Sequence, residues 1–266
     1  MTEISAALVK ELRDQTGAGM MECKRALQES GGDLAAAQKL LRERGMAAAG
    51  KRADRTTTEG LVLARTNGDA AAIVGIGCET EPVSKNEAFR AFAEKALDLV
   101  AANGAGAADE LESERVELIA QLGENIVVVG GERLQGGTLG SYVHPPANKI
   151  GVLVQLDGGT AELARQLAMH ISFAAPEFTS REDVPAETLE AERQIYLSSD
   201  EVQSKPEQAR DKIVEGMLAK RFFAASPGGA LLEQAWIHDA SKTVGAALED
   251  AGATVRAFKR VSVAGS

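Results

Sequence analysis

The chain has 266 residues, of which 44% are hydrophobic, and its formal net charge is −10. This length allows one large domain or two to three small ones, and the apolar share is normal for a globular protein. The acidic balance argues against a large nucleic-acid-binding surface, because binding to phosphates needs clustered Lys and Arg.

The sequence offers little support for a bound metal, a cofactor or a membrane span. Cys23 and Cys78 lie far apart, without CxxC spacing or a nearby group of histidines, which disfavours a disulfide framework and a structural zinc site. The glycines around Gly75 lack the third glycine of a dinucleotide fingerprint, and the common phosphate-loop and zinc-hydrolase motifs are missing. No export signal and no run of about 18 apolar residues is visible. We expect a cytoplasmic protein without metal, cofactor, direct nucleic-acid contact or membrane contact.

Residues 1–54 are predicted to form a small module of three short helices. Apolar residues recur at helical spacing in three stretches, with glycine corners at 17–19 and 31–32 between them. Asp33 is placed to cap the third helix. The module carries nine Lys or Arg and eight Asp or Glu, so the acidity belongs to the rest of the chain. Residues 47–58 are small, charged and polar, which predicts a linker that is helical at most in its first half.

The body of the chain is predicted to contain two similar halves. In residues 59–138, two apolar strands flank an Asn-Gly-Asp turn at 67–69, a strong hairpin signal, and a helix from about residue 86 to 102 follows. In residues 139–266, a second hairpin is followed by a helix over 161–174. The repeated order predicts a duplicated hairpin-plus-helix core with an antiparallel sheet.

Two charged helices are predicted between about residues 180 and 224, within the second half. Pro185 and Pro206 each stand where such a helix would begin. Ile195 is expected on the face between the two helices. Helices of similar length joined by a polar turn predict an antiparallel helical hairpin that projects from the core. The whole chain is therefore assigned to the α+β class.

The clearest candidate site is the polar stretch over residues 77–86. It joins a buried strand to a helix and is longer than the corresponding connection in the second half, which points to function. Glu79 and Glu81 are two residues apart, so an extended backbone would place both carboxylates on one side, as a metal or acid–base pair needs. Because further ligands are missing, a solvated or partner-facing pair is the preferred interpretation.

Several other residues have both a functional and a structural interpretation. Met20 and Met21 follow a glycine corner, and we expect one in the core and the other on a protein-binding surface. His144 lies in a hairpin turn and is a candidate exposed contact. His170 lies on an apolar helix face, where a satisfied core or interface residue is the common case. Cys78 has no assignable base and is interpreted as a small buried thiol.

Ordered segments along the chain resemble the bacterial elongation factor Ts family. Residues 8–13, Leu-Val-Lys-Glu-Leu-Arg, and residues 16–27, Thr-Gly-Ala-Gly-Met-Met-Glu-Cys-Lys-Arg-Ala-Leu, closely resemble the N-terminal ubiquitin-associated-like (UBA-like) module of that family. Other similar segments follow in the expected order, at 51–53, 59–60, 78–80, 83, 85–86, 122–124, 140–142, 144, 150–154, 168–170 and 241–245. The resemblance covers essentially the whole chain.

The resemblance implies a protein that acts by binding and not an enzyme. Members of the family bind the GTPase elongation factor Tu and speed the release of GDP. Their module and core contact the GTPase domain, and the second half of the core reaches another domain of the partner. No catalytic residue is needed. A factor that binds the nucleotide-free partner more tightly than the nucleotide-bound partner weakens nucleotide binding by the same factor, because the coupling between two binding sites is reciprocal. On this basis the candidate partner contacts are Lys10, Met20, Met21, His144 and His170.

The resemblance also assigns a magnesium-displacing loop to Thr80, Glu81, Pro82 and Val83. The family pattern there is Thr-Asp-Phe-Val, whose aromatic residue acts as a wedge. Glu81 keeps the acidic charge, but Pro82 replaces the phenylalanine and loses most of its contact area. Three interpretations stay open: Pro82 is a smaller wedge on a stiff loop, the rest of the interface destabilises the partner, or the protein binds and exchanges slowly.

Two functions from different classes are therefore compared. The first is a guanine-nucleotide exchange factor for elongation factor Tu. The alternative is a holding or recruitment module that uses the N-terminal helices and the helical hairpin without accelerating release. An enzyme of its own would need a bound cofactor or metal.

Overall fold

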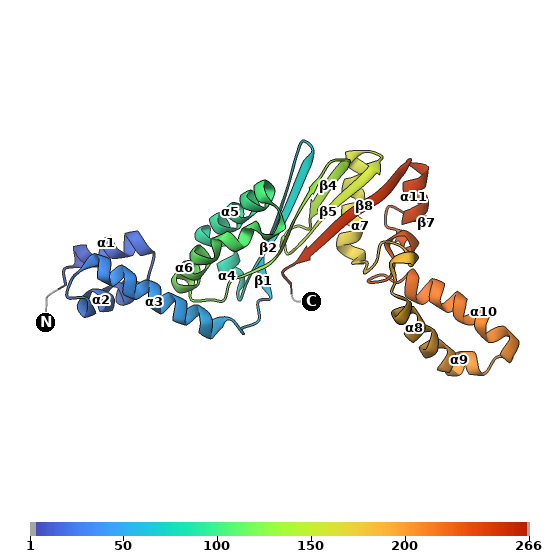
Figure 1. The fold of residues 1–266 in the computed structure, drawn as a ribbon, viewed down its shortest axis with the longest axis horizontal. Coiled ribbons are helices and arrows are strands. Elements are labelled where there is room, and N and C mark those ends of the chain that lie inside the picture. The colour runs from blue at the N-terminus through green and yellow to red at the C-terminus, as the bar shows by residue number, and fades with distance from the viewer. Residues whose placement is uncertain (1–3, 265–266) are drawn as a thin grey trace.

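The computed structural model describes residues 4–264, except for the side chain of residue 48. The molecule is elongated, with a group of short helices at one end, two three-stranded sheets and their covering helices in the middle, and a helical hairpin that projects at the other end (Figure 1). None of the helices in the described residues is long and apolar enough to cross a membrane. This mixture of separate helices and antiparallel sheets confirms the predicted α+β class.

The N-terminal module contains three helices, as predicted. They are α1 (Ala6–Thr16), α2 (Met20–Glu29) and α3 (Leu34–Arg52). Ser5 caps α1 and Asp33 caps α3, each through a side-chain oxygen that accepts a hydrogen bond from a backbone N–H of the first turn. Gly17 ends α1 in the left-handed conformation. The buried residues at the centre of the module are Val9, Leu12, Ala18, Cys23, Ala26, Leu27 and Ala37.

Helix α3 joins the module to the rest of the protein. Its second half packs on α6 (Glu112–Leu122). The two helices approach closely at Gly45, where an added Cβ would lie 3.0 Å from the Cβ of Ala120. Helical structure ends at Arg52, in agreement with a linker that is helical only in its first half.

The first sheet is antiparallel, with β2 in its centre. Its strands are β1 (Glu59–Asn67), β2 (Ala70–Cys78) and β3 (Val127–Gln135), and the helical elements beside it are α5 (Glu87–Asn103), η1 (Ala105–Leu111) and α6. The predicted hairpin turn is present, with Asn67 paired to Ala70 across two turn residues. At the other end of β1, Gly60 adopts φ +145°, and a Cβ there would lie 2.1 Å from the carbonyl oxygen of Ile76. Glycine is therefore required where β1 begins.

Strand β2 is buried on both faces, as its continuous apolar sequence predicted. Its side chains alternate between two clusters. Ala72, Val74 and Ile76 belong to the cluster that includes the buried face of α5, whereas Ala71 and Ile73 belong to a cluster shared with the second sheet. The first sheet is thus the layer between α5 and the second sheet.

The second sheet is also antiparallel and has β5 in its centre. Its strands are β4 (Thr138–Val143), β5 (Ile150–Gly158) and β8 (Ala253–Ser262), and α7 (Ala161–Ala174) covers its outer face. Leu167 and Ile171 of α7 share a buried cluster with Val152 and Val154 of β5. The remaining elements of this half are η4 (Leu231–Glu233), β6 (Ala235–Trp236), β7 (Asp239–Thr243) and α11 (Val244–Asp250).

The two sheets pack face to face. The cluster between them contains Val62 and Ile73 of the first sheet and Leu153 and Val261 of the second. Gly75 allows this approach, because a Cβ at that position would lie 2.5 Å from a methyl group of Val261. The central part of the protein therefore has four layers in the order helix, sheet, sheet, helix (Figure 1).

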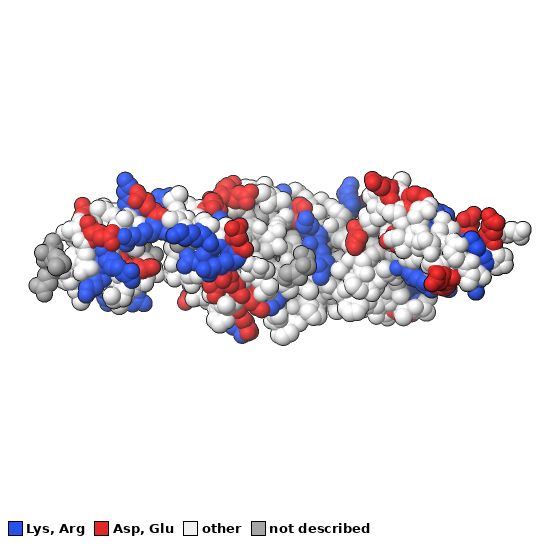
Figure 2. Space-filling model, turned by 90° about the horizontal axis from the view of Figure 1, so that it is seen from below, with Lys and Arg blue, Asp and Glu red and all other residues white. Residues whose placement is uncertain are grey.

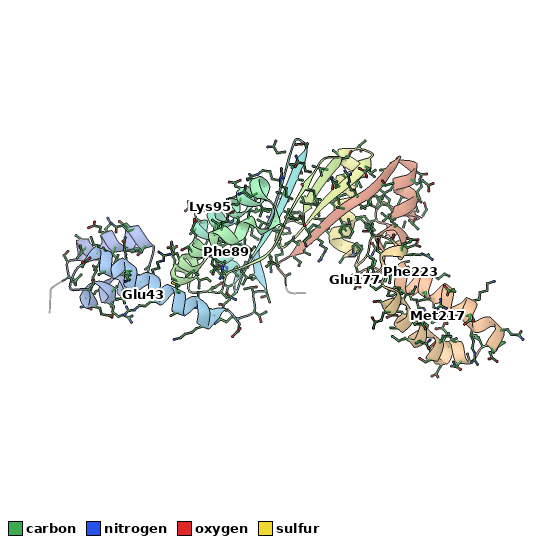
Figure 3. All side chains as sticks on the ribbon, in the orientation of Figure 1. Glu43, Phe89, Lys95, Glu177, Met217 and Phe223 are labelled. Atoms are coloured by element: carbon green, nitrogen blue, oxygen red, sulfur yellow. The ribbon has the colours of Figure 1, made fainter. Side chains whose placement is uncertain are left out.

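The projecting element is a helical hairpin, as predicted. It consists of η2 (Arg181–Asp183), α8 (Ala186–Ser198), α9 (Asp200–Gln203), α10 (Glu207–Met217) and η3 (Leu218–Phe223). Val202, Val214 and Met217 form its buried seam, and Figure 3 shows Met217 along the hairpin and Phe223 at its base. Ile195, expected between the helices, is instead exposed, because α8 turns this position away from α10.

Both halves of the core have the same order of hairpin, helix and third strand. A common origin of the two halves, the UBA-like character of the module and the domain limits at residues 54 and 138 stay predictions.

Candidate functional site

The polar stretch over residues 77–86 contains the end of β2 and a single helical turn at the end of the first sheet. Strand β2 ends at Cys78, two residues follow, and α4 (Glu81–Ser84) makes a single turn. Asn86 then caps α5 through its side-chain oxygen. Pro82 fits the first turn of α4, because a backbone N–H at that position has no partner within the helix. The surplus length of this connection is therefore folded into an ordered projection.

The turn exposes its tip and buries one anchor. Thr80, Glu81 and Pro82 are exposed, whereas Val83 is only 9% exposed and packs in the cluster beneath α5. The hydroxyl of Ser84 donates a hydrogen bond of 2.7 Å to the carbonyl oxygen of Glu81. Of the four residues expected in the magnesium-displacing loop, three reach the surface and Val83 holds the turn in place.

Glu79 and Glu81 do not form a pair, which corrects the expectation that their carboxylates lie on one side. Glu79 Oε1 accepts a hydrogen bond of 2.7 Å from the backbone N–H of Asn125 and lies 3.4 Å from the guanidinium of Arg55. Glu81 is exposed and forms an ion pair of 2.7 Å with Lys85, whose hydrogen bond lowers the pKa of Glu81. The expectation was wrong because α4 starts at Glu81, and helical backbone does not keep alternate side chains on one side.

The structure gives Cys78 a structural role. Its side chain is fully buried, its Sγ donates to the carbonyl oxygen of Thr80 at 3.3 Å, and burial raises the pKa of the thiol to about 12. A thiol that stays protonated is a poor nucleophile. Within residues 4–264, no three His, Cys, Asp or Glu side chains are grouped as a metal ion would require.

The N-terminal module presents two adjacent methionines to solvent. Met20 is 50% exposed and Met21 is 59% exposed, and Lys10 on α1 is also exposed. The expectation that one methionine lies in the core was wrong, because the helical spacing of α2 buries Cys23 and Leu27 instead. Both methionines are therefore available to a partner.

His144 is exposed in the turn between β4 and β5. Its Nδ1 lies 3.0 Å from the hydroxyl of Tyr142, and the two rings meet edge to face with centroids 5.9 Å apart. This contact holds the imidazole at the surface of the second sheet, where an exposed contact residue was expected.

His170 lies in the core, which corrects its selection as a partner contact. The side chain is 1% exposed, its Nε2 lies 2.9 Å from Oε1 of Gln234, and its Nδ1 lies 3.4 Å from the backbone nitrogen of Ile237. The ring also stacks on Trp236. Burial lowers the pKa of His170. The sequence of α7 does not reveal whether a polar residue on its apolar face has a hydrogen-bond partner in the core. The partner of His170, Gln234, lies 64 positions later in the chain.

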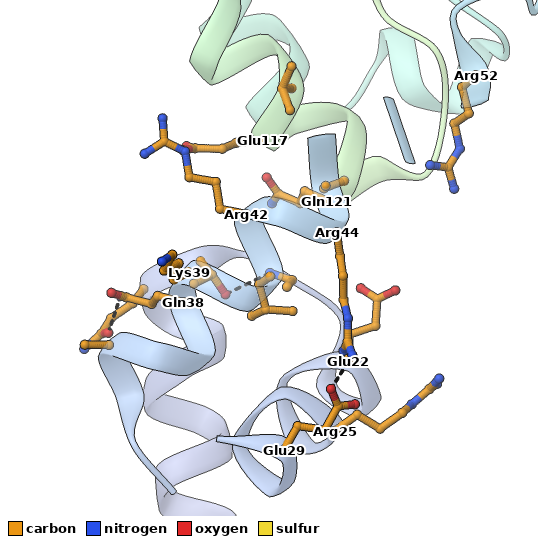
Figure 4. Close-up of a pocket in the computed structure, with 18 residues that line it drawn as sticks. Glu22, Arg25, Glu29, Gln38, Lys39, Arg42, Arg44, Arg52, Glu117 and Gln121 are labelled. Carbon is orange, nitrogen blue, oxygen red and sulfur yellow. Dashed lines mark hydrogen bonds and ion pairs between the residues drawn. The ribbon is translucent and has the colours of Figure 1, made fainter. Parts of the chain in front are cut away.

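A charged cleft of about 690 Å³ is lined by residues of the module's three helices and of α6 (Figure 4). Five cations and three carboxylates line it, namely Arg25, Lys39, Arg42, Arg44 and Arg52 with Glu22, Glu29 and Glu117. The Lys and Arg side chains continue as a band over the module and α3 (Figure 2). An ion pair of 2.5 Å between Arg44 and Glu29 crosses the module side of the cleft. Small-molecule sites are mostly apolar with a few placed polar groups, and this lining does not fit that description.

Sequence reasoning missed the residues that hold the turn at its base. Glu124 and Asn125, between α6 and β3, bond to residues 79–80. The left-handed Gly123 that ends α6 is a readable signal for a change of direction. No local pattern, however, connects this change of direction with a turn more than 40 positions earlier.

Comparisons with known proteins match the sequence of this chain to one family. A profile of the family described as Elongation factor TS matches residues 79–265. Elongation factor Ts from Thioalkalivibrio sulfidiphilus is 43% identical over 277 residues, which cover 98% of this chain and 92% of that protein. The same factor from Methylococcus capsulatus is 41% identical, with 98% and 92% covered, and that from Salmonella agona is 40% identical, with 99% and 92% covered.

Proposed function

Because this chain belongs to the elongation factor Ts family, and is thus a translation elongation factor, we propose that it binds the GTPase elongation factor Tu and speeds the release of GDP. In this proposal the protein works in the cytoplasm, without a catalytic residue, a cofactor, direct nucleic-acid contact or a membrane. Nucleotide exchange breaks no covalent bond. A protein that binds nucleotide-free elongation factor Tu more tightly than the GDP-bound form lowers the affinity for GDP by the same factor.

One observation carries the proposal: Glu81 and Pro82 project from a turn whose base is fixed. Val83 anchors the turn in the core, and Glu79 is held by Asn125. A projection that is already ordered loses little conformational entropy when it enters a partner. We propose that this turn approaches the Mg²⁺ bound with the nucleotide. Mg²⁺ in such sites is held by phosphates and only one or two carboxylates, so displacement of one protein ligand weakens GDP binding.

Exposed residues elsewhere support a wider interface. Lys10, Met20 and Met21 lie on the module, and His144 lies on the second sheet. We propose that the module (residues 1–54, UBA-like) and the first half of the core (59–138) contact the GTPase domain. The second half (139–266) reaches a further domain of the partner, and the hairpin at about 180–224 extends from it. His170 is left out of the contact set because it is buried.

The replacement of an aromatic wedge by Pro82 favours a second candidate function. Proline offers much less contact area than phenylalanine and cannot insert a flat ring between partner side chains. A protein with the module surface intact and a weak wedge would hold elongation factor Tu without accelerating GDP release.

Release of a fluorescent GDP analogue from purified elongation factor Tu of the same organism separates the two functions. We expect the release rate to rise with the concentration of this protein and then to saturate. Elongation factor Ts from Salmonella agona serves as the positive control. Formation of a stable complex, seen by size-exclusion chromatography, with an unchanged release rate would favour the holding module. Failure to form a complex or to accelerate release at micromolar concentration would contradict both functions.

A further inference from the structure

The carboxylate of Glu124 lies directly beneath the start of α4. Gly123 ends α6 in the left-handed conformation and turns the chain back toward the first sheet. Glu124 Oε2 accepts hydrogen bonds from the backbone N–H groups of Glu79 at 3.1 Å and Thr80 at 3.0 Å. Its Oε1 accepts a hydrogen bond of 2.5 Å from the hydroxyl of Thr80. One half-buried carboxylate therefore holds three donors of the segment that leads into the proposed exchange turn.

Asn125 extends the same anchor to the end of α3. Its backbone N–H donates to Glu79, and its side-chain amide donates to the carbonyl oxygens of Ala53 at 3.3 Å and Arg55 at 2.9 Å. The Asn125 side chain is 1% exposed. Three segments distant in sequence are thus tied together: the chain after α3, the chain before α4 and the chain after α6.

Helix α4 depends on this anchor because it has no side-chain cap of its own. Thr80 occupies the N-cap position, but its side chain accepts no hydrogen bond from the helix and donates to Glu124 instead. The ion pair between Glu81 and Lys85 is exposed at both ends, and such pairs contribute little to stability. The direction in which the turn projects is therefore set by Glu124 from below and by the burial of Val83.

We propose that Glu124 is a positioning residue for nucleotide exchange, which orients Glu81 and Pro82 without touching the partner itself. This role rests on the exchange function proposed above. Hydrogen bonds to a charged acceptor are about twice as strong as those between neutral groups, so the carboxylate restrains the turn firmly. Pro82 has little surface of its own, and the displacement that it causes in a partner depends on where the turn is held. Loss of the anchor lets the turn adopt other directions, which raises the entropy lost on docking.

Two substitutions of Glu124 distinguish the loss of these hydrogen bonds from the effect of any change at this position. Glu124→Ala removes all three hydrogen bonds. Glu124→Gln can keep them, because its amide oxygen can accept from the two backbone N–H groups while its NH₂ donates to the hydroxyl oxygen of Thr80. Glu114→Ala is the matched control, since Glu114 is an exposed carboxylate on α6 that pairs with Lys95 at 2.5 Å and does not contact the turn.

The first measurement is the GDP-release rate from elongation factor Tu at saturating concentrations of each variant. We expect Glu124→Ala to lower the saturating rate at least about tenfold, because it removes three hydrogen bonds to a charged acceptor and the loss of one such bond already produces an effect of this size. The Glu114→Ala protein should stay within about twofold of the wild-type rate. The Glu124→Gln protein, which can keep the three hydrogen bonds but with a neutral group, should have a rate between those of the wild type and Glu124→Ala. A Glu124→Ala protein that exchanges at the wild-type rate, or a Glu124→Gln protein as slow as Glu124→Ala, would overturn the positioning role.

The second measurement is amide hydrogen exchange in the free protein. The N–H groups of Glu79 and Thr80 should exchange faster in Glu124→Ala, while the amides of β2 before Cys78 and the thermal unfolding midpoint stay near wild type. Unchanged protection at these two amides would overturn the anchor. If the wild-type protein itself fails to accelerate GDP release, the proposed function fails; if it accelerates release and Glu124→Ala does so equally, only the positioning role fails.

Discussion

Nε2 of His170 lies 2.9 Å from Oε1 of Gln234, in the buried junction between α7 and the chain that returns from the helical hairpin. The amide NH₂ of Gln234 donates to the carbonyl oxygens of Ala174 at 3.4 Å, Ala225 at 2.8 Å and Gly228 at 2.5 Å. Its oxygen is therefore free to accept from the histidine. His170 is held as a neutral ring whose Nε2–H donates and whose Nδ1 accepts, and the pair joins the end of α7 to the base of the hairpin.

This pair predicts a pH dependence of stability. Burial lowers the pKa of His170 below its ordinary value of 6.5, so the unfolded chain binds this proton at a higher pH than the folded protein does. The free energy of unfolding should therefore fall as the pH drops below about 6.5. In His170→Gln, the difference between the free energies of unfolding at pH 7.5 and pH 5.5, measured with urea, should become smaller.

The control for this experiment is His144→Gln, because His144 is an exposed histidine. It should keep the wild-type difference between the two pH values. If the difference is unchanged in His170→Gln, the pH dependence belongs to another titratable group. His238 is the first candidate, because its charge acts on His170.

Burial also predicts the reactivity of the two cysteines. Cys23 and Cys78 are both fully buried, and the pKa of Cys78 is raised to about 12. Neither thiol should react appreciably with a disulfide reagent in the native protein up to pH 8.5, where an exposed thiol is about half ionised. Both should react within the mixing time in guanidinium chloride. Rapid loss of one thiol without denaturant, traced by comparison of Cys23→Ser with Cys78→Ser, would contradict the structure.

The module surface gives a prediction about affinity. Met20→Ala and Met21→Ala should each raise the dissociation constant of the complex with nucleotide-free elongation factor Tu about fivefold, the effect of about 1 kcal/mol at an interface. Lys10→Ala should weaken binding and reduce its dependence on salt. Because all three side chains are exposed, the free energy of unfolding should change by less than about 0.5 kcal/mol.

Met46→Ala provides the matched control for the module. Met46 is another exposed methionine, on α3, and lies outside the proposed contact set. Its substitution should leave the dissociation constant unchanged. Equal affinities for all four alanine variants and the wild type, measured by calorimetry, would remove Lys10, Met20 and Met21 from the proposed contact set.

The tip of the turn gives the last prediction. Pro82→Phe should preserve or raise the saturating GDP-release rate, because position 82 is exposed and a ring there gains contact area. Glu81→Ala should lower the rate, since it removes the exposed carboxylate at the tip of the turn. The carboxylate control is again Glu114→Ala. If neither substitution at the turn alters the rate, exchange is driven by another part of the interface.

Much of the fold could be predicted from local patterns. The Asn-Gly turn predicted the β1–β2 hairpin, in which the structure pairs Asn67 with Ala70. The helical spacing of apolar residues predicted α5 to within one residue at each end. The helical hairpin was likewise visible in its prolines and charge pattern. These features depend on interactions between residues close in sequence, for which periodicity and turn chemistry are direct evidence.

The residues at the turn show what such patterns leave undecided. The sequence by itself determined that residues 77–86 are a polar connection between a buried strand and a helix, and that Pro82 stands where relatives are expected to carry an aromatic residue. Only the tertiary structure decided that Glu79 points to Asn125, that Glu81 faces solvent and that Glu124 holds Thr80. The physical reason is that side-chain direction follows from the local backbone conformation, and hydrogen-bond partners more than 40 positions apart meet only when the helices and sheets pack together.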